Sequence, residues 1–183
     1  ILGHSKEIDV EQDRRLLESL PDVSLVFLVE PKRREINNHL WEQTWDILFF
    51  AGHSETEGES GRIYINPTDS LTLSELHYGL RKAIDHGLQL AIFNSCDGLG
   101  LVQELRRLHM PQMIVMREPV SDQVAETFLK YFLQAYAAGE PLYLAERQAR
   151  ERLQGIEHQF PCASWLPVIY QNSMATPPDW LAL

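Results

Sequence analysis

Cysteine is scarce in this chain, and long hydrophobic runs are missing. Only two of the 183 residues are cysteine, Cys96 and Cys162, and they form no Cys-x-x-Cys pair. A single disulfide would add little to a core of this size, so we expect a free Cys96 thiol in a reducing, cytoplasmic setting. No apolar run approaches the roughly 20 residues that a transmembrane helix needs, which predicts no direct membrane contact by this segment.

An excess of basic residues is also missing. The net charge is −10, and no basic stripe with interleaved aromatic residues occurs, which argues against nucleic acid as a partner. No metal or cofactor is expected either. His158 and Cys162 lack the second pair of ligands that a zinc site needs, and the DGLG run at 97–100 is not a nucleotide-binding fingerprint. We predict that Gly98 and Gly100 form a tight turn there.

What the sequence does contain is an alternation of helical patterns and apolar strand-like runs. Its length and its apolar fraction of 44% suit one domain with a substantial core. Helices are predicted at 9–20, 33–42, 74–86, 99–108, 121–138 and 142–153, with Ser74 capping the third and Ser121 or Asp122 the fifth. Strands are predicted at 23–29, 45–51, 62–65, 88–93, 113–116 and 163–170, and a loop at 55–61. This alternation predicts an α/β fold with a mostly parallel sheet and helices on both faces.

The two ends of the chain suggest a longer polypeptide. The opening ILG at 1–3 reads as the tail of a strand cut short, and the segment 173–183, with Pro177 and Pro178, reads as a linker. We therefore expect one domain over 1–172 with a truncated first strand. A tail over 173–183 would lead to further domains of the same polypeptide.

The candidate catalytic residues follow the ends of two predicted strands. The apolar run 45–51 stops at Gly52-His53-Ser54, and the run 88–93 stops just before Cys96. The C-terminal ends of parallel strands share one edge, where ligands bind in open α/β sheets. An imidazole and a thiol at that edge are what nucleophilic cysteine catalysis needs. Taken alone, Cys96 could be a small core residue and His53 a loop histidine bonded to backbone, but their matched placement favours the catalytic interpretation.

These motifs resemble those of CHAT domains, a family of the caspase-like cysteine peptidase clan. The carrying runs are ILFFAGHS at 47–54 and LAIFNSCD at 90–97, followed by MIVM at 113–116, VSD at 120–122 and AERQAR at 145–150. Cys96 follows His53 by 43 residues, close to the spacing of about 50 in caspases. The chain is most similar in character to cyanobacterial CHAT domains. The resemblance implies a three-layer caspase-like sandwich and a cysteine endopeptidase that cleaves protein or peptide substrates and is regulated by attached domains.

The resemblance also implies the roles of the site residues. Cys96 would be the nucleophile and His53 its base, and the backbone N–H groups of Ser54 and Cys96 would bind the oxyanion. The clan commonly has glycine after the histidine, whereas this chain has Ser54. That departure supports the alternative of a catalytically silent CHAT domain that acts as a protein-interaction or signalling module.

Substrate specificity is expected to come from polar residues at the same edge. Relatives that cut after basic residues hold a carboxylate there, and metacaspases place it two residues before the cysteine, where this chain has Asn94 and no charge. Candidate substrate-binding residues are Asn94, Asp97, Asp122, Glu118, Glu55, Glu57 and Glu59. Structural interpretations exist as well: a helix cap for Asp97 and Asp122, and a solvated surface turn for the loop with Glu55, Glu57 and Glu59. A second alternative, a flavodoxin-like or receiver-like module, would use residues 3–6 as a phosphate loop.

Overall fold

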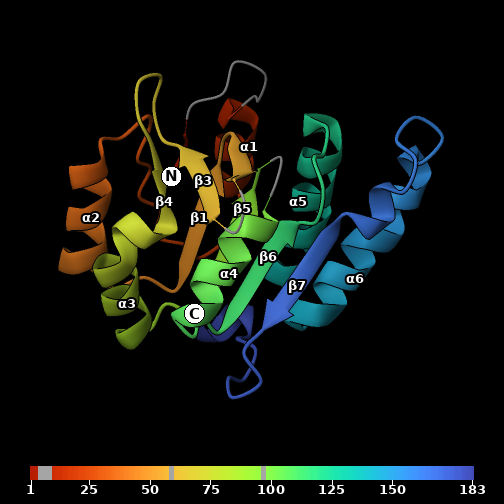
Figure 1. Cartoon of the computed structure of the whole chain (residues 1–183). Coiled ribbons are helices and arrows are strands. Elements are labelled where there is room, and N and C mark those ends of the chain that lie inside the picture. The colour runs from red at the N-terminus through yellow and green to blue at the C-terminus, as the bar shows by residue number, and fades with distance from the viewer. Residues whose placement is uncertain (4–9, 58–59, 96–97) are drawn as a thin grey trace.

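The computed structural model describes residues 1–3, 10–57, 60–95 and 98–183. At its centre lies a four-stranded sheet in the order β1 (Ile47–Ala51), β5 (Leu90–Asn94), β6 (Gln112–Met116) and β7 (Pro167–Gln171). β1, β5 and β6 run parallel, and β7 is antiparallel to β6 (Figure 1). The predicted mostly parallel sheet is confirmed.

Helices cover both faces of this sheet. The helices α2 (Arg33–Glu42), α3 (His77–Asp85) and α4 (Leu99–Arg107) pack on one face, and α1 (Val10–Glu18), α5 (Asp122–Ala137) and α6 (Leu142–Leu153) pack on the other (Figure 1). Because side chains alternate along a strand, β5 sends Ala91 and Phe93 to the first face and Leu90 and Ile92 to the second. The predicted three-layer sandwich is confirmed, and all five residues of β5 are buried.

The helix predictions hold within two residues at each end, except for the helix predicted at 74–86. There a 3₁₀ turn, Leu73–Leu76, leads into α3, and the cap is Thr72 rather than Ser74. Thr72 and Glu75 form a capping box, in which each side chain accepts a hydrogen bond from the backbone N–H of the other residue. Ser121 is the N-cap residue of α5, but its side chain makes no capping hydrogen bond.

The predicted loop at 55–61 is wrong. This stretch belongs to a second, antiparallel sheet of β2 (Ser54–Glu57), β3 (Ser60–Tyr64) and β4 (Ser70–Thr72), and residues 58–59 between β2 and β3 lie outside the described part. The stretch is polar and contains glycine, which favoured a loop, but its partner strand is local and satisfies its backbone groups. Ile63 and Leu71 anchor this small sheet in the core.

The predicted strand at 23–29 forms only at its last residue. Leu2 bridges Val29 on one side and Ala51 on the other, both in parallel. Upstream of that bridge the segment makes no ladder, and Val23, Leu25 and Val26 are exposed. A buried strand needs a partner for its backbone groups, and no described residue pairs with residues 23–27.

The C-terminal segment packs against α5. The Tyr136 hydroxyl donates to the carbonyl of Pro178 at 2.9 Å, and the Tyr136 and Trp180 rings meet edge to face at 5.4 Å. Trp180 is buried. Burial raises the pKa of Tyr136 well above its usual value, so its hydroxyl keeps its proton and can donate to Pro178.

None of the described helices combines the length and apolarity needed to cross a membrane.

Candidate active site at the sheet edge

The register of the central sheet aligns the two strand ends. Ala51, the last residue of β1, pairs with Asn94, the last residue of β5. His53 and Cys96 each come two residues after this pair. Cys96 and Asp97 lie outside the described residues, so their neighbours on either side define the site.

A buried hydrogen bond joins the two ends. The Ser54 hydroxyl donates to Ser95 Oγ at 2.8 Å, and both serines are almost fully buried. It links the residue after His53 to the residue before Cys96 along the chain. The sequence does not predict this hydrogen bond, because serine is common at strand ends and the two serines are 41 residues apart.

The strand pairing of β2 also orients the backbone of Ser54. The N–H of Tyr64 donates to the His53 carbonyl at 3.0 Å, which makes His53 and Tyr64 a hydrogen-bonded pair. Pairs alternate along an antiparallel ladder, so Ser54 and Ile63 form a non-hydrogen-bonded pair. The N–H of Ser54 is therefore directed away from β3. This direction makes it a candidate oxyanion donor at the same edge.

His53 sits half-buried in the short link between β1 and β2. Its ring lies against that of Tyr64, with centroids 5.0 Å apart and planes tilted by 47°. The Tyr64 hydroxyl in turn donates to the carboxylate of Glu55. Gly52 precedes the histidine with φ of +151°, and a side chain there would press on Phe50 and on the backbone of Gly3. Glycine at this position is thus required by both conformation and space.

The Asn94 side chain is buried and hydrogen-bonded to α1. Its side-chain amide donates to both carboxylate oxygens of Asp13, at 3.2 and 3.0 Å, and both residues are buried. The Asn94 Oδ1 atom is buried and accepts no hydrogen bond in the described structure. Asp13 was missed from the sequence, although an acid placed four residues before Leu17 on the apolar face of a helix is a detectable signal.

The remaining carboxylate candidates are dispersed. Asp122 is the half-exposed first residue of α5, Glu118 is exposed after β6, and Glu55 is held by Tyr64. The side chain of Glu57 and all of Glu59 lie outside the described residues. Within the described residues, the side-chain hydrogen bonds of Asn94 join it to Asp13, an acid that was not among the candidates.

The N-terminus of α4 faces this edge and is fixed by close backbone contacts. Gly98 is its N-cap residue, and its N–H donates to the Met116 carbonyl at 3.1 Å. The φ of Gly98 is −108°, so the predicted tight turn does not need glycine for conformation. Glycine is needed for room, since a Cβ there would lie 2.6 Å from the Cβ of Val115. The N–H of Gly100 donates to Thr56 Oγ1 at 3.2 Å, which ties α4 to β2.

A comparison with protein-family models matches residues 8–180 to the CHAT domain. The chain belongs to the CHAT domain family. CHAT domains are caspase-like and related to peptidases, in agreement with the layers and strand order described above. A search of curated proteins found no match to this CHAT domain.

Two further kinds of site were weighed from the sequence, a metal site and a phosphate loop. Within the described ranges, no three His, Cys, Asp or Glu side chains lie close enough to hold a metal ion. Of the run at 3–6 considered as a phosphate loop, only Gly3 is described, and it packs on the Phe50 ring and the Tyr64 carbonyl. A Cβ on Gly3 would approach that carbonyl to 2.4 Å.

Proposed function

We propose that this CHAT domain is a cysteine endopeptidase, with Cys96 as nucleophile, His53 as general base, and the backbone N–H groups of Ser54 and Cys96 as the oxyanion hole. The observation that carries this proposal is the 2.8 Å hydrogen bond from Ser54 to Ser95. It brings together the two strand ends on which the nucleophile and the base stand. The outward direction of the Ser54 N–H supports the oxyanion role.

In the proposed reaction, the Cys96 thiolate attacks the carbonyl carbon of a peptide bond and a carbon–sulfur bond forms. The positive end of the α4 dipole favours a thiolate nearby. His53 takes the thiol proton and delivers it to the amide nitrogen, which leaves as an amine when the carbon–nitrogen bond breaks. Water, activated by the same imidazole, then hydrolyses the thioester. Two N–H donors aimed at the oxyanion supply the largest electrostatic contribution in such sites.

The nucleophile is tested by labelling with a peptidyl acyloxymethyl ketone. We expect covalent labelling of the wild type, and its loss in Cys96→Ala. Cys162→Ala is the matched control, because Cys162 is the exposed free thiol and should not be required. His53→Ala should slow labelling by about 10²–10⁴-fold, the usual contribution of a general base. Equal labelling of Cys96→Ala and wild type would exclude the proposed nucleophile, and absence of labelling in the wild type would favour the silent interaction module.

We also propose that this site prefers a basic side chain at the residue before the cleaved bond. Asp13 carries a buried carboxylate, and the Asn94 Oδ1 beside it accepts no hydrogen bond within the described structure. Both groups are acceptors, and they meet where α1 contacts Asn94, the last residue of β5 and two residues before Cys96. A guanidinium or ammonium group matches such a pair, because it offers several donors and a positive charge.

A peptide panel that varies only this position tests the preference. Cleavage after Arg or Lys should exceed cleavage after Ala by tenfold or more in kcat/KM. Asp13→Asn should remove most of that ratio, yet leave alkylation of Cys96 by iodoacetamide unchanged. Glu118→Gln, at an exposed carboxylate near the same edge, serves as the control and should keep the ratio. Equal or better cleavage after Asp would refute the basic preference without touching the nucleophile assignment.

A further inference from the structure

One face of the small antiparallel sheet gathers polar side chains around His53. Side chains alternate along a strand, so the buried side chains of Ser54 and Ile63 occupy the inner face of this sheet. His53, Glu55 and Tyr64 therefore share the opposite face, and all three are half-buried. His53 continues the line of β2, because the Tyr64 N–H donates to the His53 carbonyl at 3.0 Å.

Tyr64 lies directly against the imidazole ring of His53. The two ring centroids are 5.0 Å apart, and the ring planes are tilted by 47°. This separation is within the usual range for aromatic rings in contact, and side chains directly opposite each other on neighbouring strands stabilise a sheet. The contact limits rotation of the imidazole about its side-chain bonds on the side that Tyr64 covers.

Tyr64 is itself fixed at three points. Its backbone N–H is bonded to His53, its backbone pairs with Ser70 of β4, and its hydroxyl donates to the carboxylate of Glu55. Glu55 stands two residues after His53 on β2, so this last bond joins the strand that follows the histidine to the strand opposite. A ring held at its backbone and at its hydroxyl presents a fixed surface to the imidazole.

Packing in the core does not account for Tyr64. Among the described residues, the side chains that form or border the two hydrophobic clusters of the core do not include it. Its neighbour Ile63, which is 1% exposed, anchors β3 in the core instead. The bond from the Tyr64 hydroxyl also gives Glu55 a partner within the protein, whereas the sequence indicated a substrate contact for this acid.

We propose that Tyr64, held by Glu55, is a positioning residue that fixes the imidazole of His53 in the orientation that general-base catalysis at Cys96 requires. The proposal rests on the proposed peptidase function and adds to it two residues that act through the histidine. Catalytic groups must be held close to the productive geometry by neighbours whose own rotamers are locked. A misplacement of about 1 Å can cost about 10²-fold in rate. Tyr64 covers the imidazole, and Glu55 holds Tyr64 in place.

Labelling by the peptidyl acyloxymethyl ketone tests this role. Tyr64→Leu should slow labelling of Cys96 by about tenfold or more, because the imidazole loses its fixed orientation. Tyr64→Phe keeps the ring and loses only the hydroxyl, so its rate should lie between those of Tyr64→Leu and wild type. Tyr78→Leu is the matched control. Tyr78 also contacts a histidine ring, that of His77, but it is 74% exposed on α3, so this variant should label like wild type.

The hydrogen bond to Glu55 is tested by a double-mutant cycle. Glu55→Leu should slow labelling by the same factor as Tyr64→Phe, because each removes one partner of the same bond. The two substitutions together should slow labelling no further than either alone. Factors that multiply in the double variant would show that Glu55 does not act through Tyr64 and would overturn its part in the proposal.

A second cycle separates positioning of His53 from general support of the fold. In the His53→Ala background, Tyr64→Leu should change the residual labelling rate by less than about twofold, because the group that it positions is gone. The same factor in both backgrounds would overturn the proposal, as would equal labelling of Tyr64→Leu and wild type. A wild type that takes up no label would give a distinct result, since it would overturn the peptidase function itself and with it the positioning role.

The ring-proton NMR signals of His53 in the Cys96→Ala chain test the contact itself, independently of catalysis. The neighbouring aromatic ring should displace these signals from the values of a free histidine. Tyr64→Phe should keep that displacement, and Tyr64→Leu should remove it. Unchanged signals in Tyr64→Leu would overturn the proposal whether or not the wild type is labelled.

Discussion

At the scale of single residues, the site depends on polar groups buried in pairs. Ser54 is paired with Ser95, and Asn94 with Asp13. A buried polar group without a partner costs roughly 1–3 kcal/mol, so each pair holds its strand end in place as well as satisfying hydrogen bonds. Asn94 is the more telling case, because an amide can donate to Asp13 whereas a carboxylate at the same position cannot.

Asn94→Asp is therefore expected to destabilise the fold by about 2–4 kcal/mol near neutral pH, since it buries two carboxylates against each other. The new pair would hold one proton, because the pKa of one carboxyl is raised when like charges share a site. A raised carboxyl pKa means that the folded state binds more protons, so the penalty should shrink as pH falls toward 4. Urea unfolding at pH 4.5 and 7.5 measures this.

The swap Asp13→Asn combined with Asn94→Asp is the control. It restores one amide and one carboxylate and should recover part of the lost stability. A single Asn94→Asp variant as stable as wild type at pH 7.5 would contradict a direct buried contact between these residues.

At the scale of elements, the small antiparallel sheet positions the edge. β3 crosses the N-terminal end of α4 with Gly61 in contact, and a Cβ on Gly61 would lie 2.4 Å from the Leu101 nitrogen. The atom nearest to that Cβ and a second one, the Gly100 carbonyl carbon at 2.7 Å, are backbone and cannot rotate away. The hairpin therefore packs on the helix that follows Cys96, while its first residue, Ser54, follows His53. One rigid contact thus relates the two halves of the site.

Gly61→Ala should destabilise the domain by about 1–3 kcal/mol, the usual cost of overpacking against unyielding neighbours. It should also slow labelling of Cys96 by an electrophile, because the hairpin must move away from α4. Gly155→Ala is the matched control, since nothing lies within 4 Å of a Cβ there, and it should be neutral or slightly stabilising. Thermal unfolding and labelling rates of the two variants give the comparison. Similar values for both would show that the hairpin does not depend on this contact.

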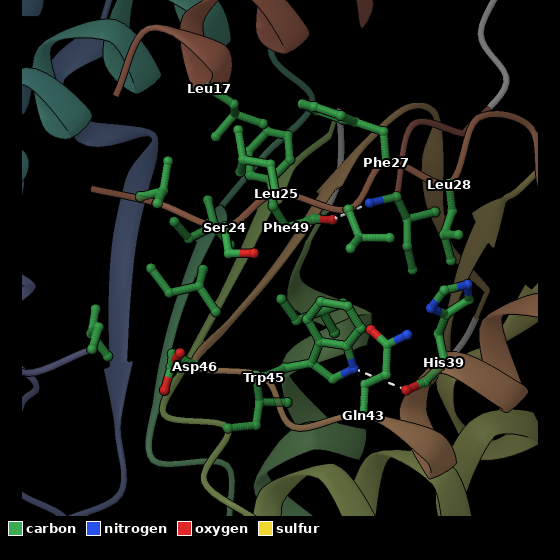
Figure 2. A pocket seen from close by; sticks show the side chains of 18 of the residues that line it. Leu17, Ser24, Leu25, Phe27, Leu28, His39, Gln43, Trp45, Asp46 and Phe49 are labelled. Carbon is green, nitrogen blue, oxygen red and sulfur yellow. Dashed lines mark hydrogen bonds between the residues drawn. The ribbon is translucent and has the colours of Figure 1, made fainter. Parts of the chain in front are cut away.

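At the scale of the whole molecule, the middle of the central sheet is well packed and one of its edges borders a cavity. The inner strands β5 and β6 are buried along their full length, whereas the edge strand β1 borders an apolar cavity of about 460 Å³ that it shares with the segment 22–28 (Figure 2). In a chain that begins at Ile1, that residue lines the cavity and its α-amino group donates to the Phe49 carbonyl. Its titration should therefore report on the state of this edge.

The stability of such a chain should rise between pH 5 and pH 8. Burial lowers the pKa of the Ile1 α-amino group from 8.0 to about 5, so in this window the unfolded chain holds a proton that the folded chain does not. The free energy of unfolding then increases with pH, by on the order of 2–4 kcal/mol across the window for a shift of this size. Urea unfolding at several pH values measures the slope.

Acetylation of the Ile1 nitrogen provides the control for that slope. An acetyl amide keeps the N–H that donates to Phe49 but cannot take up a proton. The difference in unfolding free energy between the acetylated and the free chain should be largest at pH 5 and should vanish above pH 8. A constant difference across this range would contradict a buried, neutral amine.

The sequence by itself determined the α/β class, most helices and the matched ends of the two strands that precede His53 and Cys96. These features follow from local hydrophobic periodicity and from the order of motifs. Tertiary structure decided what periodicity cannot encode: the Asp13–Asn94 pair 81 residues apart, the contact of Gly61 with α4, and the failure of 23–29 to complete a strand. A strand forms only when a partner satisfies its backbone groups, and a buried carboxylate is stable only beside a donor. Both conditions depend on residues that are distant in sequence and near in space.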